Sequence, residues 1–213
     1  MKNPENSDWN ISDANVFWAE IAPTEHVVQI YENDDIFLDL LKSFVINGFD
    51  AGDAVVLIAT KNHLQLLHDR LVKAGADIAA LRSDDQYIPL DADETLAEFM
   101  VGGWPDAVLF RQTINRIIRR ARQKNRPLRA FGEMVAVLWA NGLSGATVHL
   151  ENLWNRVCET EAFCLFCAYP KSGFVQDTVS SMHIICCAHS KMVSGEHDPK
   201  SQIRYKTVLR PAG

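Results

Sequence analysis

The sequence of 213 residues lacks the features that define several large functional classes. No apolar run approaches the roughly 20 residues that a membrane-spanning helix needs. The first ten residues, MKNPENSDWN, contain no apolar signal-peptide core, so we expect a cytoplasmic protein with no membrane partner. With 47% hydrophobic and 23% charged residues, the composition is typical of a globular chain.

Motifs for nucleotide and hydrolase chemistry are also missing. After the first predicted strand the chain reads YENDDIFL, without the glycines or the Lys-Ser/Thr pair of a phosphate-binding loop. No GxGxxG occurs, and GLSGAT is not a nucleophile elbow because its glycines are wrongly spaced around Ser144. We therefore predict no catalytic residues, no cofactor and no enzymatic activity.

The metal-ligating residue types show no spacing that indicates a metal site. The five cysteines include CLFC, but Cys164 and Cys167 lie in an apolar run that is typical of a strand. Positions i and i+3 of a strand point to opposite faces, so the two sulfurs cannot share a metal. The seven histidines form no convincing cluster in the sequence either. We therefore predict no metal site.

Hydrophobic patterning predicts strands that alternate with helices. The predicted strands are 26–31, 51–60 (with a preceding turn), 86–91, 127–134 and 162–170. The predicted helices are 36–49, 61–77, 94–100, 107–124, 150–160 and 177–193, and 135–142 is a helix or loop. The alternation indicates a three-layer α/β/α fold with a mainly parallel sheet of about five strands. Residues 202–209 suggest an extra edge strand at the C-terminus.

The carboxyl ends of the predicted strands give the candidate ligand site. In open α/β sheets, ligands bind beyond these ends, so residues there are expected to lie together. The predicted ligand contacts are Tyr31, Glu32, Thr60, Asp91, Glu133, Met134 and Tyr169. Glu133 is the penultimate residue of the segment LRAFGEM and can be read as a catalytic acid, a ligand contact or a polar residue just past the strand. Its position favours the ligand contact.

One segment carries positive charge in a chain whose formal net charge is -6. Between Arg111 and Arg129 there are eight basic residues and no acidic ones. Ile114, Ile118 and their neighbours recur at helical spacing, which predicts an amphipathic helix with a basic outer face. That face is either solvated or binds an acidic partner or nucleic acid, although no nucleic-acid motif accompanies it. The candidate partner contacts are Arg116, Arg119 and Arg120.

Several segments together resemble the MEDS domain, a sensory domain named for methanogens, methylotrophs and the dichloromethane regulator DcmR. The resemblance covers about residues 24 to 193 and rests on HVVQIYENDD, LRAFGEM, LENLWN and FCLFCAYP. The residues that match the family pattern are His26, Tyr31, Gly48, Gly52, Asp53, Gly132, Glu133, Met134, Glu151, Cys167 and Tyr169. The resemblance implies a RecA/KaiC-like core that has lost its phosphate loop, in agreement with the missing glycine-lysine motif.

The resemblance also implies a function. Members are thought to sense small molecules, with hydrocarbon derivatives proposed, and to signal to kinases or transcription regulators. We therefore expect an N-terminal arm (1–22), a sensory domain (23–193) and a C-terminal extension (194–213). The ligand would bind at the strand ends and a signalling protein, or a second copy of the chain, would read the change. The alternatives are a degenerate nucleotide-binding protein or hydrolase, and an interaction scaffold that uses the basic helix.

Overall fold

The computed structural model describes residues 9–174, 178–195 and 202–208. Parts of the predicted arm (1–8) and of the predicted extension (196–201 and 209–213) lie outside these residues. Ten strands are formed: β1 (Asn10–Asp13), β2 (His26–Tyr31), β3 (Ala54–Ala59), β4 (Tyr87–Asp91), β5 (Met100–Val101), β6 (Trp104–Pro105), β7 (Leu128–Gly132), β8 (Cys164–Pro170), β9 (Lys191–Val193) and β10 (Gln202–Thr207). Eight of them build one sheet, and β5 pairs with β6 in a small hairpin.

Nine helices connect these strands along the described chain: α1 (Ala14–Glu20), α2 (Asp34–Ala51), α3 (Lys61–Lys73), α4 (Ile78–Ser83), α5 (Ala92–Ala97), α6 (Ala107–Ala121), α7 (Met134–Ala140), α8 (Ser144–Glu161) and α9 (Thr178–Cys187). Polar residues at the strand ends start several of them. The side chains of Asn33, Thr60, Asp91 and Asp106 accept hydrogen bonds from the first free N–H groups of α2, α3, α5 and α6. Such caps stabilise a helix by about 1 kcal/mol each. The strand ends are therefore also the helix starts.

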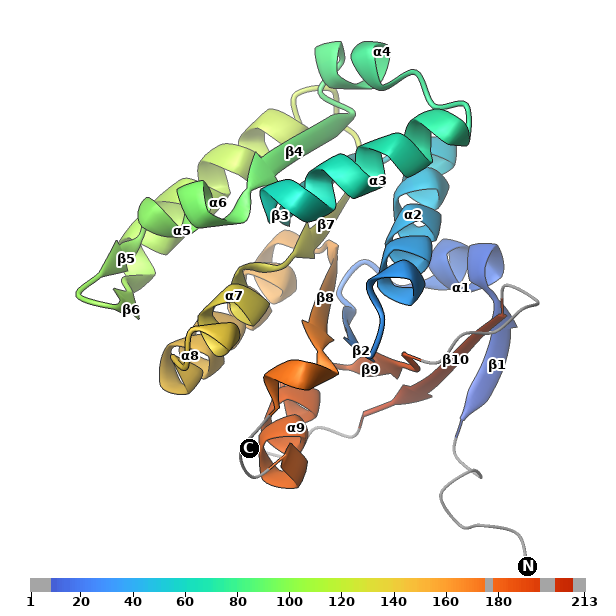
Figure 1. The fold of residues 1–213 in the computed structure, drawn as a ribbon. Coiled ribbons are helices and arrows are strands. Elements are labelled where there is room, and N and C mark those ends of the chain that lie inside the picture. Colours follow the sequence, from blue (N-terminus) through green and yellow to red (C-terminus); the bar gives the residue numbers. More distant parts are fainter. Residues whose placement is uncertain (1–8, 175–177, 196–201, 209–213) are drawn as a thin grey trace, which may run out of the picture.

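The large sheet has the order β1-β10-β9-β2-β8-β7-β3-β4 (Figure 1). The strands from β9 to β4 run parallel, while β10 is antiparallel to β9 and β1 to β10. The central strands β2, β3, β7 and β8 are almost wholly buried, which fits their continuous apolar sequences. This confirms the predicted α/β fold with a mainly parallel sheet.

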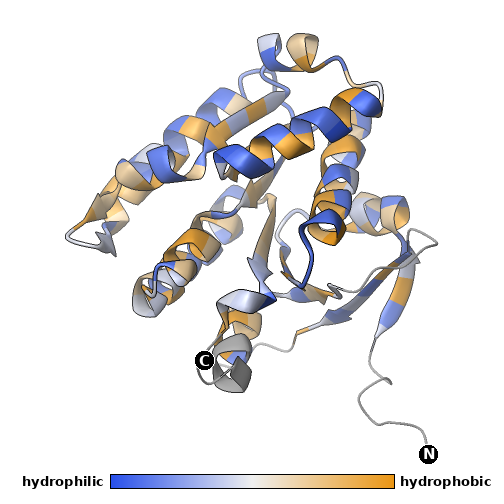
Figure 2. Cartoon of the chain, viewed as in Figure 1, coloured by the Kyte–Doolittle hydropathy of each residue, from blue (hydrophilic) through white to orange (hydrophobic). Residues whose placement is uncertain are grey.

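The side chains of each strand alternate between two hydrophobic cores, one on each face of the sheet. One core packs Val27, Tyr31 and Phe166 against α1 to α4, and we call this the α2 face. The other packs Val28 and Tyr169 against α5 to α9, and we call it the α8 face. Hydrophobic residues fill the central strands, and hydrophilic residues appear along the helices between the apolar positions (Figure 2). The face to which a side chain points therefore decides which residues it meets.

The glycines of the family pattern support a buried ion pair rather than a ligand site. A Cβ on Gly48 would lie 2.7 Å from the Cδ atom of Arg129, so only glycine fits where α2 crosses that side chain. Gly52 ends α2 at φ 79°, a left-handed conformation that favours glycine. Asp53 then forms an ion pair with Arg129, and the Nε–H group of Arg129 donates a hydrogen bond to the Asp53 carboxylate at 2.8 Å. This pair fixes the end of α2 to β7.

The sheet is larger than the sequence predicts, with eight strands instead of about five. The predicted arm contributes β1 as well as the docked helix α1, whose Phe17 and Trp18 are buried. The helix predicted to run to Val193 ends at Cys187, and residues 191–193 form β9 instead. The predicted C-terminal edge strand is β10, but β1 covers it and is the actual edge. These strands are short and partly polar, so their hydrophobic pattern is weak. No helix of the described residues is long and apolar enough to cross a membrane.

Candidate functional site

Glu133 lies at the carboxyl end of β7, where the sequence predicts it, but protein groups already bind its carboxylate. Its backbone N–H donates to Ile58 O at 2.8 Å, which holds it beside the end of β3. One carboxylate oxygen accepts from the Thr60 N–H at 2.8 Å, and the other lies 2.7 Å from His63 Nδ1. Glu133 is 6% exposed and His63 is 8% exposed. The His63–Glu133 pair thus joins β7 to the start of α3.

Acidic and aromatic groups surround the His63–Glu133 pair. Asp34 Oδ2 lies 3.8 Å from His63 Nε2, on the side opposite Glu133. Burial alone lowers the pKa of His63, but the hydrogen bond and charge of Glu133, with the nearby Asp34, outweigh it and raise that pKa above 6.5. Tyr31 stacks on Phe37 at 4.7 Å, and burial next to Glu133 and Asp34 raises the pKa of the Tyr31 hydroxyl. The cluster is therefore a compensated ion pair beneath an aromatic stack.

Two of the other predicted contacts, Met134 and Tyr169, do not join this cluster. Tyr31 and Tyr169 point to opposite faces, because Ile30 is the register partner of Tyr169 and adjacent positions of a strand alternate. Met134 begins α7 and packs in the core of the α8 face. The sequence-based grouping of Tyr31, Glu133 and Tyr169 on one wall therefore does not match the geometry. Of the predicted contacts, Tyr31, Thr60 and Glu133 lie together.

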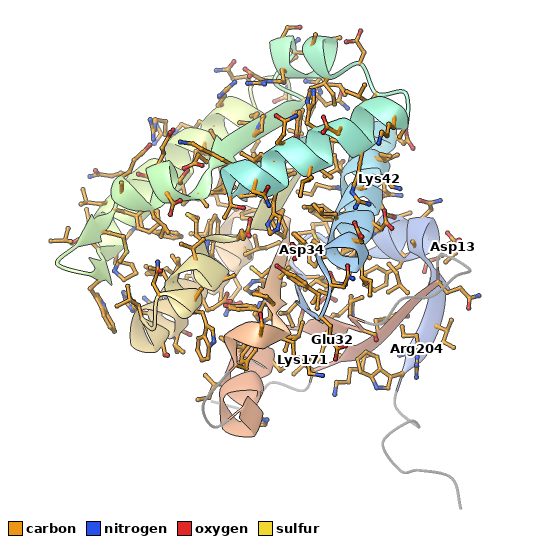
Figure 3. All side chains as sticks on the ribbon, in the orientation of Figure 1. Asp13, Glu32, Asp34, Lys42, Lys171 and Arg204 are labelled. Atoms are coloured by element: carbon orange, nitrogen blue, oxygen red, sulfur yellow. The ribbon has the colours of Figure 1, made fainter. Side chains whose placement is uncertain are left out.

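The remaining strand-end residues act at the rim and as helix caps. Glu32 is exposed and forms an ion pair with Lys171, and the two side chains lie next to each other in Figure 3. Thr60 caps α3 and Asp91 caps α5. Their side-chain oxygens are therefore used, at least in part, to satisfy backbone groups.

A cavity of about 520 Å³ lies on the α2 face, away from the predicted contacts. It is enclosed by α2 on one side and by β1, the start of α1, and β10 on the other, with β2 and β9 between them. Its lining residues are Asp13, Ala14, Asn15, Gln29, Ile36, Asp39, Leu40, Lys42, Ser43, Ile46, Val193, Ser194, Gln202, Ile203 and Arg204. Asp13, Lys42 and Arg204 mark three of its sides in Figure 3. We call this the α2–β10 cavity.

Two buried polar atoms of the α2–β10 cavity stand out. Gln29 Oε1 and Ser43 Oγ have no hydrogen-bond partner among the described residues. Within the described part of the chain, the Gln29 amide forms one long hydrogen bond, from Nε2 to Ser194 O at 3.5 Å. A buried polar group without a partner costs about 1–3 kcal/mol. The sequence did offer a signal for this site, because Gln29 is the one polar residue within the apolar run VVQIY.

A second polar cluster lies on the α8 face, where the sequence predicts no metal site. The ligand-type atoms of His26, Glu151, Cys167 and His189 all lie within 4.8 Å of one another, and all four residues are buried. His26 Nε2 is 3.3 Å from Cys167 Sγ and 3.6 Å from Glu151 Oε2, and His189 Nε2 is 3.6 Å from Glu151 Oε1. The Tyr169 hydroxyl donates to Glu151. We call these four residues the buried His–Cys–Glu cluster.

The environment of the buried His–Cys–Glu cluster contains no fixed cation among the described residues. Burial raises the pKa of Glu151 to about 8, although the hydrogen bond from Tyr169 acts in the opposite direction. Burial also raises the pKa of Cys167 well above 9.0, and the neighbouring Glu151 adds to the rise. Cys164 points to the α2 face, so the prediction that the two cysteines of CLFC cannot share a metal is confirmed. The four cluster residues come from distant parts of the chain, which explains why no spacing motif revealed them.

The first four basic residues of the basic segment lie in α6, and the other four lie after it, the last of them in β7. Much of the charge is paired with acidic neighbours. Arg116 forms an ion pair with Glu98, and Arg120 with Asp85. Among the described residues, Arg119 forms no ion pair. The helix is therefore amphipathic as predicted, but its outer face is much less positive than the sequence alone indicates.

Comparison with known proteins identifies the family. The profile of the MEDS family, described as the methanogen/methylotroph DcmR sensory domain, matches residues 25–190. The chain belongs to the MEDS family. Its fold is similar to that of the KaiC-like protein PH0186 from the hyperthermophilic archaeon Pyrococcus horikoshii OT3, with a TM-score of 0.57, 12% identity and coverage of 89% of this chain and 83% of that one.

A second archaeal structure gives a similar result. It was determined in the study of PH0250 from Pyrococcus horikoshii OT3 and matches with a TM-score of 0.56, 12% identity and coverage of 87% of this chain and 88% of that one. No curated protein matches. The likeness confirms a KaiC-like RecA fold, and the family description assigns this MEDS chain a sensory role.

Proposed function

We propose that this MEDS chain is a non-enzymatic sensory module that binds a small neutral molecule in the α2–β10 cavity and signals to a partner protein. The observation that carries the proposal is a cavity of about 520 Å³ with two unpartnered buried polar atoms, Gln29 Oε1 and Ser43 Oγ. Small-molecule sites are typically about 300–1,000 Å³ and combine apolar walls with a few placed polar groups. A bound ligand would supply the missing hydrogen bonds.

The lining of the α2–β10 cavity indicates the class of ligand. Its charged side chains include both signs, and Lys42 lies 3.6 Å from Asp39. The apolar wall comes from Ile36, Leu40 and Ile203. A molecule that satisfies both parts has an apolar body and a hydroxyl or amide N–H to donate to Gln29. A neutral hydrocarbon derivative has this chemistry.

The position of the α2–β10 cavity provides a route for the signal. Its walls join α2, which packs on the central sheet, to β1 and β10, which form the sheet edge. A ligand that contacts both walls favours the state in which they are close, and it can shift the equilibrium only by that difference in affinity. A partner protein, or a second copy of the chain, that binds near β1 would read this change.

The nucleotide alternative receives no support from the corresponding connection. In this fold the loop between β2 and α2 takes the place of a phosphate loop, and here it holds Glu32 and Asn33. Asp34 and Asp35 follow in the first turn of α2. These carboxylates repel phosphate, although the helix N-terminus itself would attract it. We therefore expect no thermal shift with ATP or ADP and Mg²⁺ at millimolar concentration.

The test of the cavity uses Gln29→Met, which keeps the volume and removes the amide. Thermal shift with a panel of short-chain alcohols, ketones, amides and chloromethanes is measured on wild type and variant. The best binder of the wild type should bind the variant about tenfold more weakly, because one hydrogen bond is lost. Gln123→Met, at an exposed position after α6, is the matched control.

A second pair of variants tests the cavity without touching its polar groups. Leu40→Trp fills the space from α2, and it should abolish binding while circular dichroism stays that of the wild type. Leu66→Trp, at an exposed position of α3, should leave binding unchanged. If Glu133→Gln instead removes binding and both cavity variants retain it, the ligand lies at the strand ends and the cavity assignment is wrong.

A further inference from the structure

The buried His–Cys–Glu cluster combines side chains from four separate elements. His26 begins β2, Cys167 lies in β8 and Glu151 lies in α8, while His189 lies between α9 and β9. All four are at most 1% exposed. Two imidazoles, a thiol and a carboxyl group are the ligand types that zinc prefers, and no other residue set of the described chain brings three such groups as close.

Neighbouring groups orient both imidazoles so that their Nε2 atoms face the cluster. The Asn155 amide donates from Nδ2 to Ala188 O at 2.9 Å, so its Oδ1 atom is the acceptor that faces His26 Nδ1 at 2.9 Å. His189 Nδ1 lies 2.7 Å from Ile185 O, a carbonyl that can only accept. Both Nδ1 atoms therefore carry the proton, and in the neutral imidazoles both Nε2 atoms are left with a lone pair.

This arrangement is the one that zinc-ligating histidines show. Such residues usually donate their second ring N–H to a carbonyl or carboxylate, which fixes the tautomer and the ring direction. Here an amide oxygen and a backbone carbonyl have that role for His26 and His189. In a hydrophobic core, two oriented imidazoles facing a thiol and a carboxyl group have no evident packing purpose.

Three of the six distances between ligand atoms fit a tetrahedral ion, and the other three are at most 4.8 Å. Zinc binds nitrogen and oxygen at about 2.0–2.2 Å and sulfur at about 2.3 Å, so neighbouring ligand atoms lie roughly 3.3–3.8 Å apart. The separations from His26 Nε2 to Cys167 Sγ and to Glu151 Oε2 are 3.3 and 3.6 Å. The separation from His189 Nε2 to Glu151 Oε1 is 3.6 Å.

A small cavity adjoins the cluster at Glu151. This cavity of about 200 Å³ lies between α8 and α9, and Glu151 is part of its lining together with Asn152, Ile185 and Ala188. It lies on the α8 face, on the other side of the sheet from the α2–β10 cavity. The two sites can therefore be tested independently.

We propose that His26, Glu151, Cys167 and His189 form a binding site for a zinc-class divalent cation. The ligands are both Nε2 atoms, the Cys167 sulfur as thiolate and the Glu151 carboxylate. When the ion binds, the Cys167 thiol proton and any proton on the Glu151 carboxyl group are released to solvent. Four protein ligands leave no open position, so the ion has a structural role. It fixes α8 and the α9–β9 connection to β2 and β8.

The test begins with the metal content of the full chain, purified with its tag removed and without chelators. Mass spectrometry of the elements should find one zinc ion per chain, or one after Zn²⁺ is added and excess is removed. Wild-type protein that holds less than a tenth of an equivalent after Zn²⁺ addition overturns the proposal. This measurement does not depend on whether any variant folds.

Cobalt substitution then identifies the ligands. Co²⁺ in place of zinc should give the visible bands of a tetrahedral site and a thiolate-to-cobalt band in the near ultraviolet. Cys167→Ser should lose the thiolate band, and Cys164→Ser, a buried cysteine of the same strand on the opposite face, should keep it. Equal spectra for the two variants contradict the assignment, as does a wild-type spectrum without a thiolate band.

A milder variant separates metal binding from folding. Asn155→Leu removes the acceptor at His26 Nδ1 and leaves all four ligands in place. Loss of such a group typically weakens metal binding about 10- to 100-fold. Competition with a chromophoric zinc chelator measures this change. An unaltered zinc affinity in the folded variant shows that His26 is not a ligand.

Discussion

Two buried glutamates on opposite faces of the sheet have opposite surroundings. Glu133, on the α2 face, accepts hydrogen bonds from Thr60 N–H and is paired with His63. Glu151, on the α8 face, accepts only the Tyr169 hydroxyl, and its Oε2 atom has no hydrogen-bond partner among the described residues. Burial shifts the pKa of Glu151 to about 8, whereas the pair at Glu133 raises the pKa of His63. At the first site the protein supplies the positive charge, and at the second it does not.

This difference separates structural from binding roles. A carboxylate whose oxygens already accept hydrogen bonds from protein donors has no need of a ligand, and a ligand would have to displace one of these donors. Glu151 has one donor, the Tyr169 hydroxyl, and its second oxygen can be satisfied by a proton or a cation. The same reasoning applies to Gln29 and Ser43 in the α2–β10 cavity, where polar atoms also lack partners. We therefore propose binding at the unsatisfied groups rather than at the strand ends.

The largest expected effect on stability comes from removing the Glu133 carboxylate of the His63–Glu133 pair. Glu133→Ala leaves His63 buried beside Asp34 without its closer partner and frees the Thr60 N–H. Breaking a buried pair in this way costs about 3 kcal/mol in the free energy of unfolding, measured with urea. Glu98→Ala, which breaks a largely exposed pair with Arg116, is the control and should cost about 1 kcal/mol or less. Equal losses would mean that Glu133 is not compensated by His63.

A smaller effect separates the two glutamates directly. In zinc-free protein, Glu133→Gln should cost about 2 kcal/mol, because a hydrogen bond to a charged partner is lost. Glu151→Gln keeps an acceptor for Tyr169 and should cost about 1 kcal/mol or less. The measurement is urea unfolding after dialysis against a chelator. A larger loss of unfolding free energy for Glu151→Gln than for Glu133→Gln would mean that Glu151, and not Glu133, is the glutamate held by protein partners.

The central strands could be predicted because buried parallel strands are continuous apolar runs. HVVQIY and CLFCAYP needed no knowledge of their neighbours. The strands β1 and β9 were missed, and β10 was predicted as a strand but wrongly as the sheet edge. These features depend on pairing across the chain, such as Asn10 with Tyr205. A polar segment such as NISD becomes a strand only when a partner edge is available.

The sequence predicted the position of the candidate site along the strands, but not the face of the sheet on which each side chain lies. The strand-end rule correctly placed Glu133 next to Thr60 and on the same side of the sheet as Tyr31. It could not place Tyr169, because the face of a residue depends on register, and a shift of one position reverses it. The His26–Cys167 contact joins residues 141 positions apart, which no motif spacing reports. Local chemistry is thus readable from sequence, whereas convergence of distant groups is not.

The charge on His63 makes the first site dependent on pH. Because its pKa in the folded protein is raised above 6.5, the pair stabilises the fold fully below the unfolded pKa and loses this contribution as pH rises through the folded pKa. The difference in unfolding free energy between wild type and His63→Gln should therefore shrink from mildly acidic to alkaline pH. Leu66→Gln, at an exposed position of the same helix, removes no titratable group and is the control, so it should show no such trend. A difference that grows with pH would mean that His63 is neutral in the pair.

The smallest effect is expected at the surface of α6, where pairs resemble the His63–Glu133 pair in charge but not in burial. Arg120 lies 2.6 Å from Asp85, yet its side chain is 49% exposed, so water competes for both ions. Arg120→Gln should change the free energy of unfolding by about 0.5 kcal/mol or less, like Arg119→Gln, whose side chain forms no ion pair with any described residue. A loss of more than about 1 kcal/mol for Arg120→Gln alone would show that pairing, rather than burial, sets the strength of these contacts. It would also remove the reason for treating the His63–Glu133 pair as different in kind, because both pairs would then owe their strength to charge alone.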